Sequence, residues 1–413
     1  MKILVVCQYY APEPFRISDI CESLVSMGHE VVVITGTPNY PTGKIYPGYK
    51  WLRKCQETVS RVKVFRVPLI PRGQSFIQLA MNYVSFAVLS CIWILFFKHN
   101  FDVVYVHQLS PVTMVLPALL YKKITGKKVL LYCLDIWPES IAAANISRSS
   151  PVYSLLLVVS RWIYHGVDSV CVSSFSFIQY LKETIKLDVD DKNYLPQFAE
   201  ELYMSVPSGD CKPPEGTVSF LFAGNIGEMQ SVETIIRAAF KLKDLKNVQW
   251  HIVGDGSAHK RCENMTRELG LTDRIFFYGQ RPANEMPAFF SKASALLVTL
   301  KRHDYISCTL PGKVQSYMAA GKPLIGAIDG ETKKIIEESG CGLCCEAENY
   351  EALAKLVRQF VSEPWKVTSY SSNSLKYYED NFRKSTFMKR LVSMLQDLCD
   401  QNLSKASPYE KNV

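Results

Sequence analysis

The stretch TVSFLFAGNIGEMQS, residues 217–231, contains the pattern on which the rest of the chain is built. It opens with a continuous apolar run, turns at GNIG (residues 224–227), and gives way to a helical pattern near Ser231. An apolar run without alternation predicts a strand covered on both faces, as in a parallel sheet between helices. Glycines at the end of such a strand let backbone N–H groups approach a phosphate, and the following helix adds partial positive charge. A tight strand-to-helix turn without any ligand explains the same residues.

The same strand-then-helix pattern recurs along the chain in two series, before and after a Pro- and Gly-containing stretch at 196–216. The predicted strands are residues 2–7, 30–35, 102–106, 128–133 and 168–172 in the first series and residues 217–223, 248–253, 274–278, 295–299 and 323–326 in the second. We therefore predict an α/β protein with two doubly wound, Rossmann-like domains facing across a cleft. The predicted domains are 1–200, 201–373 and a C-terminal helix and tail at 374–413, for which packing back on the first domain is one arrangement.

Composition narrows the protein class. The 413 residues suggest at least two domains, and the thirteen cysteines are scattered, apart from Cys341, Cys344 and Cys345. No second cysteine pair or histidine lies near that group, so we read it as a buried strand rather than a metal site. The first residues form a strand rather than a leader, and the chain reads as cytoplasmic with reduced thiols. Disorder is expected only in the last ten or so residues.

A basic segment precedes an apolar helix in the first half of the chain. The segment, residues 50–72, carries a single acid, Glu57, against these basic residues: Lys50, Arg53, Lys54, Arg61, Lys63, Arg66 and Arg72. The stretch at 76–97 has no charge and is long enough to cross a bilayer, although crossing would split the first sheet. Gln78, Asn82 and Ser85 recur at helical spacing as a polar stripe. Three interpretations of residues 76–97 remain open: a helix lying in the plane of an anionic membrane, a core helix, and a helix that spans the membrane. The basic segment favours the first.

Candidate donor-site residues follow the strands of the second domain. A second glycine turn, VGDGS at 253–257, supports a ligand site floored by strand ends. Lys313 follows Pro311 and Gly312 just before a helical pattern, where its ammonium group could neutralise a diphosphate; a solvated lysine is the alternative.

In the first domain, Asp135 in LLYCLDIWPES either caps a helix or orients an acceptor hydroxyl. His107, at the end of DVVYVHQ, has the same ambiguity between structure and chemistry. The loop after strand 30–35 holds Asn39, whose amide could hydrogen-bond a ligand, and Tyr40, whose ring could stack on one. A rigid turn packed on the sheet edge explains the loop equally well.

Taken together, these stretches resemble bacterial glycosyltransferase family 4. The resemblance rests on GHEVVVITGTPNYPTG, LDIWPES, FAGNIGEMQSVETIIRAA, HIVGDGS, FYGQRPANEMPAFFSKASALLV, LPGKVQSYMAAGKPLI and GETKKIIEESGCGL, in register from residue 1 to about 395. More narrowly, the chain is similar to the L-fucosamine-transferase-like subgroup of O-antigen and capsule synthesis. The resemblance implies a GT-B fold, a donor site mainly in the second domain, an acceptor site in the first, and retention of anomeric configuration without a metal. At such an acceptor site Asn39 could hydrogen-bond a glycan and Tyr40 could stack on a sugar face.

Two departures from the wider family stand out. The paired glutamates of many members are replaced by Cys308 and Ser316, and the Arg and Lys of the first glycine turn by Asn225 and Gln230. The resemblance implies a donor site made of Gly224, Asn225, Gly227, Gln230, Gly254, Asp255, Arg281, Lys313 and Glu331, with Lys301 and Arg302 as weaker candidates. We read DVDD at 188–191 as solvated rather than as a metal-binding Asp-x-Asp.

The resulting expectation is a retaining glycosyltransferase. It would move an N-acetylated or deoxy hexose from a UDP-sugar to an undecaprenyl-diphosphate-linked glycan at the inner face of the plasma membrane, with Asp135 and then His107 positioning the acceptor. Neither a cofactor nor nucleic acid is expected. A nucleotide-sugar 2-epimerase and a non-catalytic scaffold are the alternatives, and the oligomeric state is open.

Overall fold

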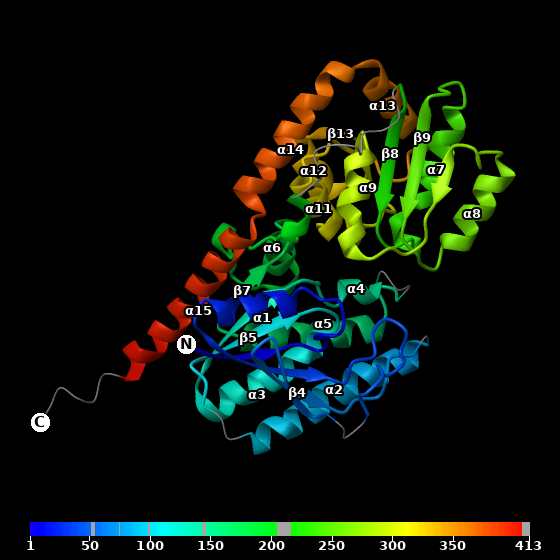
Figure 1. Ribbon diagram of the computed structural model, residues 1–413. Helices are drawn as coiled ribbons and strands as arrows, with labels where there is room; N and C mark the ends of the chain where they lie inside the picture. The colour runs from blue at the N-terminus through cyan, green and yellow to red at the C-terminus, as the bar shows by residue number, and fades with distance from the viewer. Residues whose placement is uncertain (51–53, 74, 98–99, 143–145, 205–215, 407–413) are drawn as a thin grey trace, which may run out of the picture. The chain divides into compact units, whose positions relative to one another are not determined.

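The structure is a computed structural model, which describes residues 1–50, 54–73, 75–97, 100–142, 146–204 and 216–406 (Figure 1). It divides into two compact units. The N-terminal unit comprises Met1–Leu195 together with Met388–Val413, and the C-terminal unit comprises Pro196–Phe387.

The N-terminal unit is built on a seven-stranded sheet in the order β3-β4-β2-β1-β5-β6-β7. Its strands are β1 (Lys2–Val6), β2 (Glu30–Gly36), β3 (Gln56–Val59), β4 (Val62–Val67), β5 (Val103–Gln108), β6 (Lys128–Cys133) and β7 (Ser169–Val172). All neighbours run parallel except the β3–β4 hairpin. The parallel strands are ordered as in a classic dinucleotide-binding sheet, which places the switch point between β1 and β5.

Helices connect these strands and cover both faces of the sheet (Figure 1). The helices and helical turns are α1 (Ile17–Ser26), α2 (Phe76–Phe96), η1 (Val112–Val115), α3 (Leu116–Thr125), α4 (Glu139–Ala142), α5 (Pro151–Gly166), α6 (Ser176–Tyr180), η2 (Leu181–Ile185), η3 (Asp191–Asn193) and α15 (Lys384–Ala406). The α2 helix starts at a capping box made by Ser75 and Gln78, which explains its sharp beginning. In α15, Arg390 donates a hydrogen bond to the carbonyl of Tyr194 and so ties the helix to this unit.

The C-terminal unit has a six-stranded, fully parallel sheet in the order β10-β9-β8-β11-β12-β13. Its strands are β8 (Val218–Ala223), β9 (Val248–Val253), β10 (Ile275–Phe277), β11 (Ala295–Thr299), β12 (Leu324–Ala327) and β13 (Gly342–Cys345). This is again the dinucleotide-binding order, with the switch point between β8 and β11. The predicted fold of two doubly wound sheets is therefore confirmed, and β13 accounts for the clustered cysteines.

Two apolar clusters fill the two faces of the second sheet, around Trp250 on one side and Tyr317 on the other. The elements involved are η4 (Glu201–Met204), η5 (Glu228–Gln230), α7 (Val232–Lys241), α8 (His259–Glu268), η6 (Ala283–Glu285), α9 (Met286–Lys292), α10 (Asp304–Ser307), α11 (Gly312–Ala319), α12 (Gly330–Ser339), α13 (Tyr350–Ser362), η7 (Pro364–Lys366) and α14 (Val367–Asn381). The helix predicted as one piece from residue 374 is two, α14 and α15, with a break around Phe382.

The basic segment at 50–72 proved to contain the β3–β4 hairpin, which the sequence reading missed. Alternation in VKVFRV was the available signal, because β4 has one buried face and one exposed face in its first half. Arg66 is only 3% exposed and its guanidinium pairs with Glu57 at 2.6 Å. Arg66 therefore belongs to the fold rather than to a basic surface, and Arg53 lies outside the described residues.

The α2 helix turns Asn82 and Ser85 of its polar stripe toward the protein, whereas Gln78 in its first turn is exposed. Asn82 is fully buried, where it accepts a 2.8 Å hydrogen bond from Gln8 and donates to the carbonyl of Ile70, and Ser85 accepts from the amide of Ile70. The opposite face is apolar and at least 41% exposed: Ile77, Met81, Val84, Val88, Ile92 and Leu95. The α2 helix is the one described helix long and apolar enough to cross a membrane, yet only 28% of its most apolar window is buried. It is therefore not a core helix.

Candidate functional site

At the carboxyl edge of the second sheet, two glycine turns pack directly against each other. The Gly224 amide donates to the Val253 carbonyl, and a Cβ on Gly254 would stand 1.8 Å from the Gly224 carbonyl oxygen. Gly254 also has a φ of +136°, which side chains rarely adopt. This amide is therefore used inside the fold, and the role of the glycine turns at a phosphate stays a prediction. Gly254 serves the close approach of the two turns.

Lys313 lies over this edge, in the first turn of α11. Its ammonium nitrogen donates a 2.6 Å hydrogen bond to Gln230 Oε1 and lies 3.9 Å from the centroid of the Phe222 ring. A Cβ on Gly224 would stand 3.2 Å from that nitrogen. The glycine therefore keeps space for the lysine, and the structure brings together three residues that sequence reading proposed separately.

The electrostatic state of Lys313 is unusual. Desolvation by burial lowers the pKa of its amine to about 7. Gln230 contributes a dipole but no charge, so the ammonium form has no full counter-charge in this hydrogen bond. An incoming anion would supply that charge and favour the protonated lysine. The position is thus suited to a ligand that carries negative charge.

The other predicted donor residues are spread along the same sheet edge. Asn225 lies over Gly227, because a Cβ added to Gly227 would stand 2.7 Å from the side-chain amide nitrogen of Asn225. Asp255 is exposed and accepts hydrogen bonds from the Gly256 amide and from His259. Arg281 follows β10 and donates to the carbonyl of Tyr278.

Glu331 is buried in the first turn of α12, two strands along the sheet from β8. Lys301 and Arg302 form ion pairs with Glu228 and Asp329.

In the N-terminal unit, the loop after β2 is held from inside by a buried carboxylate. Glu13 accepts hydrogen bonds from the amides of Asn39 at 2.8 Å and Tyr40 at 2.7 Å, and burial raises its pKa. Asn39 is 1% exposed; its side chain donates to Thr37 and accepts from the Arg72 amide. The expectation that Asn39 meets a glycan is therefore wrong, because both ends of its amide group build the loop.

Tyr40 is better placed, being partly exposed within an aromatic cluster. Its ring lies 5.4 Å from that of Tyr9 and 5.0 Å from that of Phe15, centroid to centroid. The guanidinium of Arg72 lies 5.5 Å from the centre of the Tyr40 ring and donates a hydrogen bond to the Tyr9 hydroxyl. This cluster was not anticipated beyond Tyr40, although YYAPEPF at 9–15 supplies two of its rings.

Asp135 is positioned by a hydrogen-bonded chain. The indole N–H of Trp137 donates to Ser110 Oγ at 2.9 Å, and the Ser110 hydroxyl donates a short hydrogen bond to Asp135 Oδ2. The carboxylate is 9% exposed, beyond the end of β6. Sequence reading found Asp135 but gave no role to Ser110, which comes from the neighbouring strand end, or to Trp137. The two hydrogen bonds, from Trp137 to Ser110 and from Ser110 to Asp135, fix the orientation of one carboxylate at a sheet edge.

His107 does not share that position. It lies inside β5, is 2% exposed, and contacts Tyr105, whose hydroxyl lies 3.2 Å from its Nδ1, and the Tyr132 ring. Desolvation by burial, with a smaller effect from Arg16, lowers the pKa of His107 to about 3. The predicted catalytic role is therefore corrected: a neutral imidazole enclosed in the sheet is structural.

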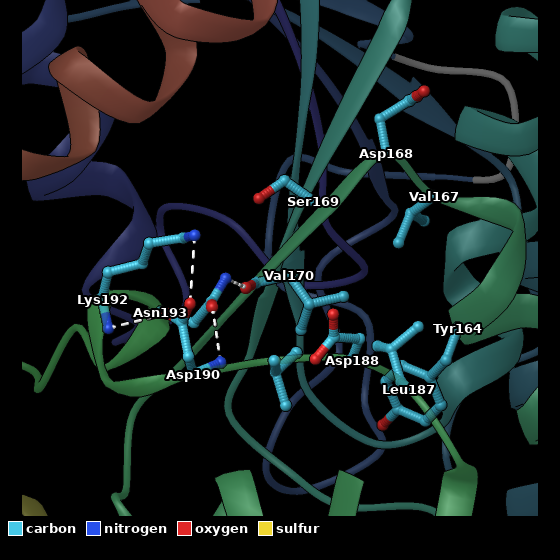
Figure 2. A pocket seen from close by; sticks show the side chains of 11 residues that line it. Tyr164, Val167, Asp168, Ser169, Val170, Leu187, Asp188, Asp190, Lys192 and Asn193 are labelled. Atoms are coloured by element: carbon cyan, nitrogen blue, oxygen red, sulfur yellow. Dashed lines mark hydrogen bonds and ion pairs between the residues drawn. The ribbon is translucent and has the colours of Figure 1, made fainter. Parts of the chain in front are cut away.

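The Asp-x-Asp-like stretch lies elsewhere, in a hollow of 190 Å³ at the amino end of β7 (Figure 2). Asp190 caps the η3 turn and pairs with Lys192, while Asn193 donates to the Val170 carbonyl. Ligands of doubly wound sheets bind at the opposite edge. Among the residues described, no group of three His, Cys, Asp or Glu side chains is placed to hold a metal ion.

Comparison with known families assigns a domain to each half of the chain. Residues 15–189 match the glycosyl transferase 4-like domain, and residues 210–379 match the domain described as glycosyl transferases group 1. The chain thus carries two glycosyltransferase domains, each centred on one of the two sheets.

Relatives and solved structures agree with these domains. WcaI of Escherichia coli (strain K12), named as a colanic acid biosynthesis glycosyl transferase, is 27% identical over 95% of this chain and 99% of its own. Sucrose-phosphate synthase from Thermosynechococcus elongatus aligns over 96% of this chain and 99% of its own, with a TM-score of 0.74 and 16% identity. The Anabaena protein Alr3699/HepE, solved with UDP, aligns over 96% and 100%, with a TM-score of 0.69 and 14% identity. These structures establish the GT-B fold.

Proposed function

We propose that this chain, with its two glycosyltransferase domains, is a retaining glycosyltransferase that moves a hexose from a UDP-sugar to a lipid-linked glycan in bacterial surface polysaccharide synthesis. The observation that carries the proposal is the placement of Lys313 over Gly224 and beside Gln230, at the switch point of the second sheet. A relative named for colanic acid biosynthesis and a structural neighbour solved with UDP support the acceptor class and the donor.

The chemistry asks for an anion-stabilising group at this point. When the bond between the sugar C1 and the diphosphate oxygen breaks, negative charge develops on the leaving group and the sugar gains oxocarbenium character. Lys313 would meet that charge, and its stabilisation grows toward the transition state. The acceptor oxygen then bonds to C1 on the face that the nucleotide leaves, and its proton passes to the departing phosphate. In this scheme Asp135, held by Ser110, orients the acceptor hydroxyl rather than acting as a strong base.

The exposed face of α2 supports attachment to a membrane surface. Its six apolar side chains form one stripe, whereas Asn82 and Ser90 are buried on the side that faces the protein. This distribution is typical of a helix lying in a membrane interface. Replacing Val84, Val88 and Ile92 by serine should release the protein from vesicles containing anionic lipid. Unchanged co-sedimentation of the triple variant would refute the membrane contact.

The direct test of the function is a binding and transfer experiment. Calorimetry should detect UDP binding, with GDP as the matched nucleotide, and incubation with UDP-sugars and lipid-linked glycans should yield an elongated glycan of unchanged anomeric configuration. Absence of nucleotide binding would refute a catalytic role. Conversion of the UDP-sugar without any acceptor would instead identify an epimerase.

A further inference from the structure

An apolar pocket opens between α2 and α5 in the N-terminal unit. It measures 290 Å³, the small end of the range for ligand sites. Its apolar walls come from two helices, with Leu79, Ala80 and Val84 on α2 and Val152 and Leu156 on α5. The lining also includes polar residues: Tyr83 on α2, and Ser110, Thr113, Trp137 and Ser140 from the segments that follow β5 and β6.

The pocket adjoins the candidate acceptor site, because the two share residues. Ser110 and Trp137 line the pocket and also form the hydrogen-bonded chain that holds Asp135. The Tyr83 hydroxyl is hydrogen-bonded by Arg72, whose charge lowers the pKa of that phenol against a larger rise from burial. A molecule in the pocket would therefore lie against apolar walls, close to a carboxylate that is bonded to Ser110 and to a guanidinium that is bonded to Tyr83.

The α5 helix, which forms one wall of the pocket, also carries exposed apolar side chains next to it. On α5, the side chains of Val152, Leu155, Val158 and Trp162 are 49–64% exposed and recur at helical spacing. The pocket thus lies between two helices that each present an apolar stripe outward. A lipid chain arriving from a membrane would reach the pocket without crossing water, which argues against a water-soluble occupant.

We infer that this pocket holds the first carbons of the polyprenyl chain of the acceptor, with the adjoining diphosphate at Arg72 and the glycan directed toward Asp135. The inference rests on the proposed function for the identity of the acceptor. It assigns a binding role to α5 and Arg72, which the motifs did not indicate. Arg72 matches the negative charge of the diphosphate, and the apolar walls match the hydrocarbon.

The test fills the pocket. Ala80→Phe, or Leu156→Trp from the opposite wall, should weaken binding of radiolabelled farnesyl diphosphate in equilibrium dialysis by about tenfold or more, a loss of about 1.4 kcal/mol. Ser154→Phe adds the same ring to α5 at an exposed position that does not line the pocket, and should bind as the wild type does. Circular dichroism melting checks that each variant is folded.

Three results would overturn the inference: equal binding by Ala80→Phe and Ser154→Phe, binding of inorganic diphosphate as tight as that of farnesyl diphosphate, or displacement of the probe by phosphatidylglycerol, which would make bulk lipid the occupant. The proposed function is read separately, by transfer to lipid-linked glycans. A protein that binds farnesyl diphosphate in a pocket-dependent way yet transfers no sugar would keep the pocket and lose the function. If the wild type and Ala80→Phe both transfer sugar with the same KM for the acceptor, the proposed function stands and the role of the pocket is refuted.

Discussion

The two sheets of this chain share one strand order but carry different chemistry at their switch points. In the C-terminal unit the strand ends carry glycines, and the ammonium group of Lys313, from α11, packs on an aromatic ring beside them. In the N-terminal unit they carry aromatic rings and carboxylates, including Asp135, held by internal hydrogen bonds. Strand order therefore determines where a ligand binds, and side chains determine which ligand. As proposed above, the C-terminal edge suits the diphosphate of a nucleotide sugar, and the N-terminal edge suits an acceptor sugar together with its lipid diphosphate carrier.

The largest expected effect comes from removing the cation at the C-terminal edge. Lys313→Met should lower transfer by about 1,000-fold, the upper range for losing one group that stabilises transition-state charge. UDP affinity should fall as well, because the ground state already carries the diphosphate. Lys241→Met, which removes an exposed lysine paired with Glu351, is the matched control. Equal steady-state kinetics for the two variants would show that Lys313 contributes no more to transfer than an ordinary exposed lysine.

The glycine pair should separate stability from chemistry within that edge. Gly254→Ala should lower the free energy of unfolding by about 3 kcal/mol, because the new Cβ meets the Gly224 carbonyl at a positive φ. Gly224→Ala is also strained, at a φ of +147°, but its Cβ meets only the flexible end of Lys313, so it should cost less stability than Gly254→Ala and more UDP affinity. Urea titration and calorimetry measure the two quantities. Similar losses of stability in both variants would contradict this division of roles.

At the N-terminal edge the expected loss is confined to the acceptor step. Asp135→Asn should lower kcat by about 100-fold while leaving UDP affinity unchanged, since the carboxylate lies in the other unit from Lys313. Ser110→Ala should lower kcat by about tenfold, because it loosens the carboxylate without removing it. Asp168→Asn, at the amino end of β7, is a control for losing a carboxylate from the same unit. A fall in UDP affinity in Asp135→Asn would contradict the assignment.

The contrast between the edges also explains what could be read from the sequence. Continuous apolar runs predicted most of the strands, and hence the two doubly wound sheets, because strands covered on both faces need no polar side chains. The β3–β4 hairpin was missed since its charged residues looked like a surface, although Arg66 is buried against Glu57. Glycine turns pointed to the carboxyl edge of the second sheet, where the donor is proposed to bind, but they did not show that the Gly224 amide is used within the fold.

The N-terminal edge was less predictable for a physical reason. Asn39 and His107 are polar residues at or near strand ends, and such residues serve a ligand or the fold according to which partners surround them. Their partners, Glu13 for the loop and the Tyr132 ring beside the imidazole, are brought there only by tertiary structure. The exposed stripe on α5 escaped notice for the opposite reason, because an apolar helical stripe normally predicts core packing.

The smallest effect is a pH dependence that should exist at one edge only. Free Lys313 has a pKa near 7, and a bound diphosphate would raise it, so binding takes up a proton. Affinity for a UDP-sugar should therefore be highest below pH 7 and fall about tenfold between pH 6 and pH 8, as the free lysine loses its proton. A UDP-sugar is the right probe, because its diphosphate, esterified at both ends, does not titrate in this range. Lys313→Arg, whose guanidinium stays charged, should bind with an affinity independent of pH.

Binding of farnesyl diphosphate at the Arg72 edge should lack this lysine-linked term and be the same in wild type and Lys313→Arg at each pH. A wild-type profile as flat as that of the arginine variant would mean that the lysine is already charged in the free protein, and the C-terminal edge would then attract its anion by a fixed charge rather than by one that forms on binding.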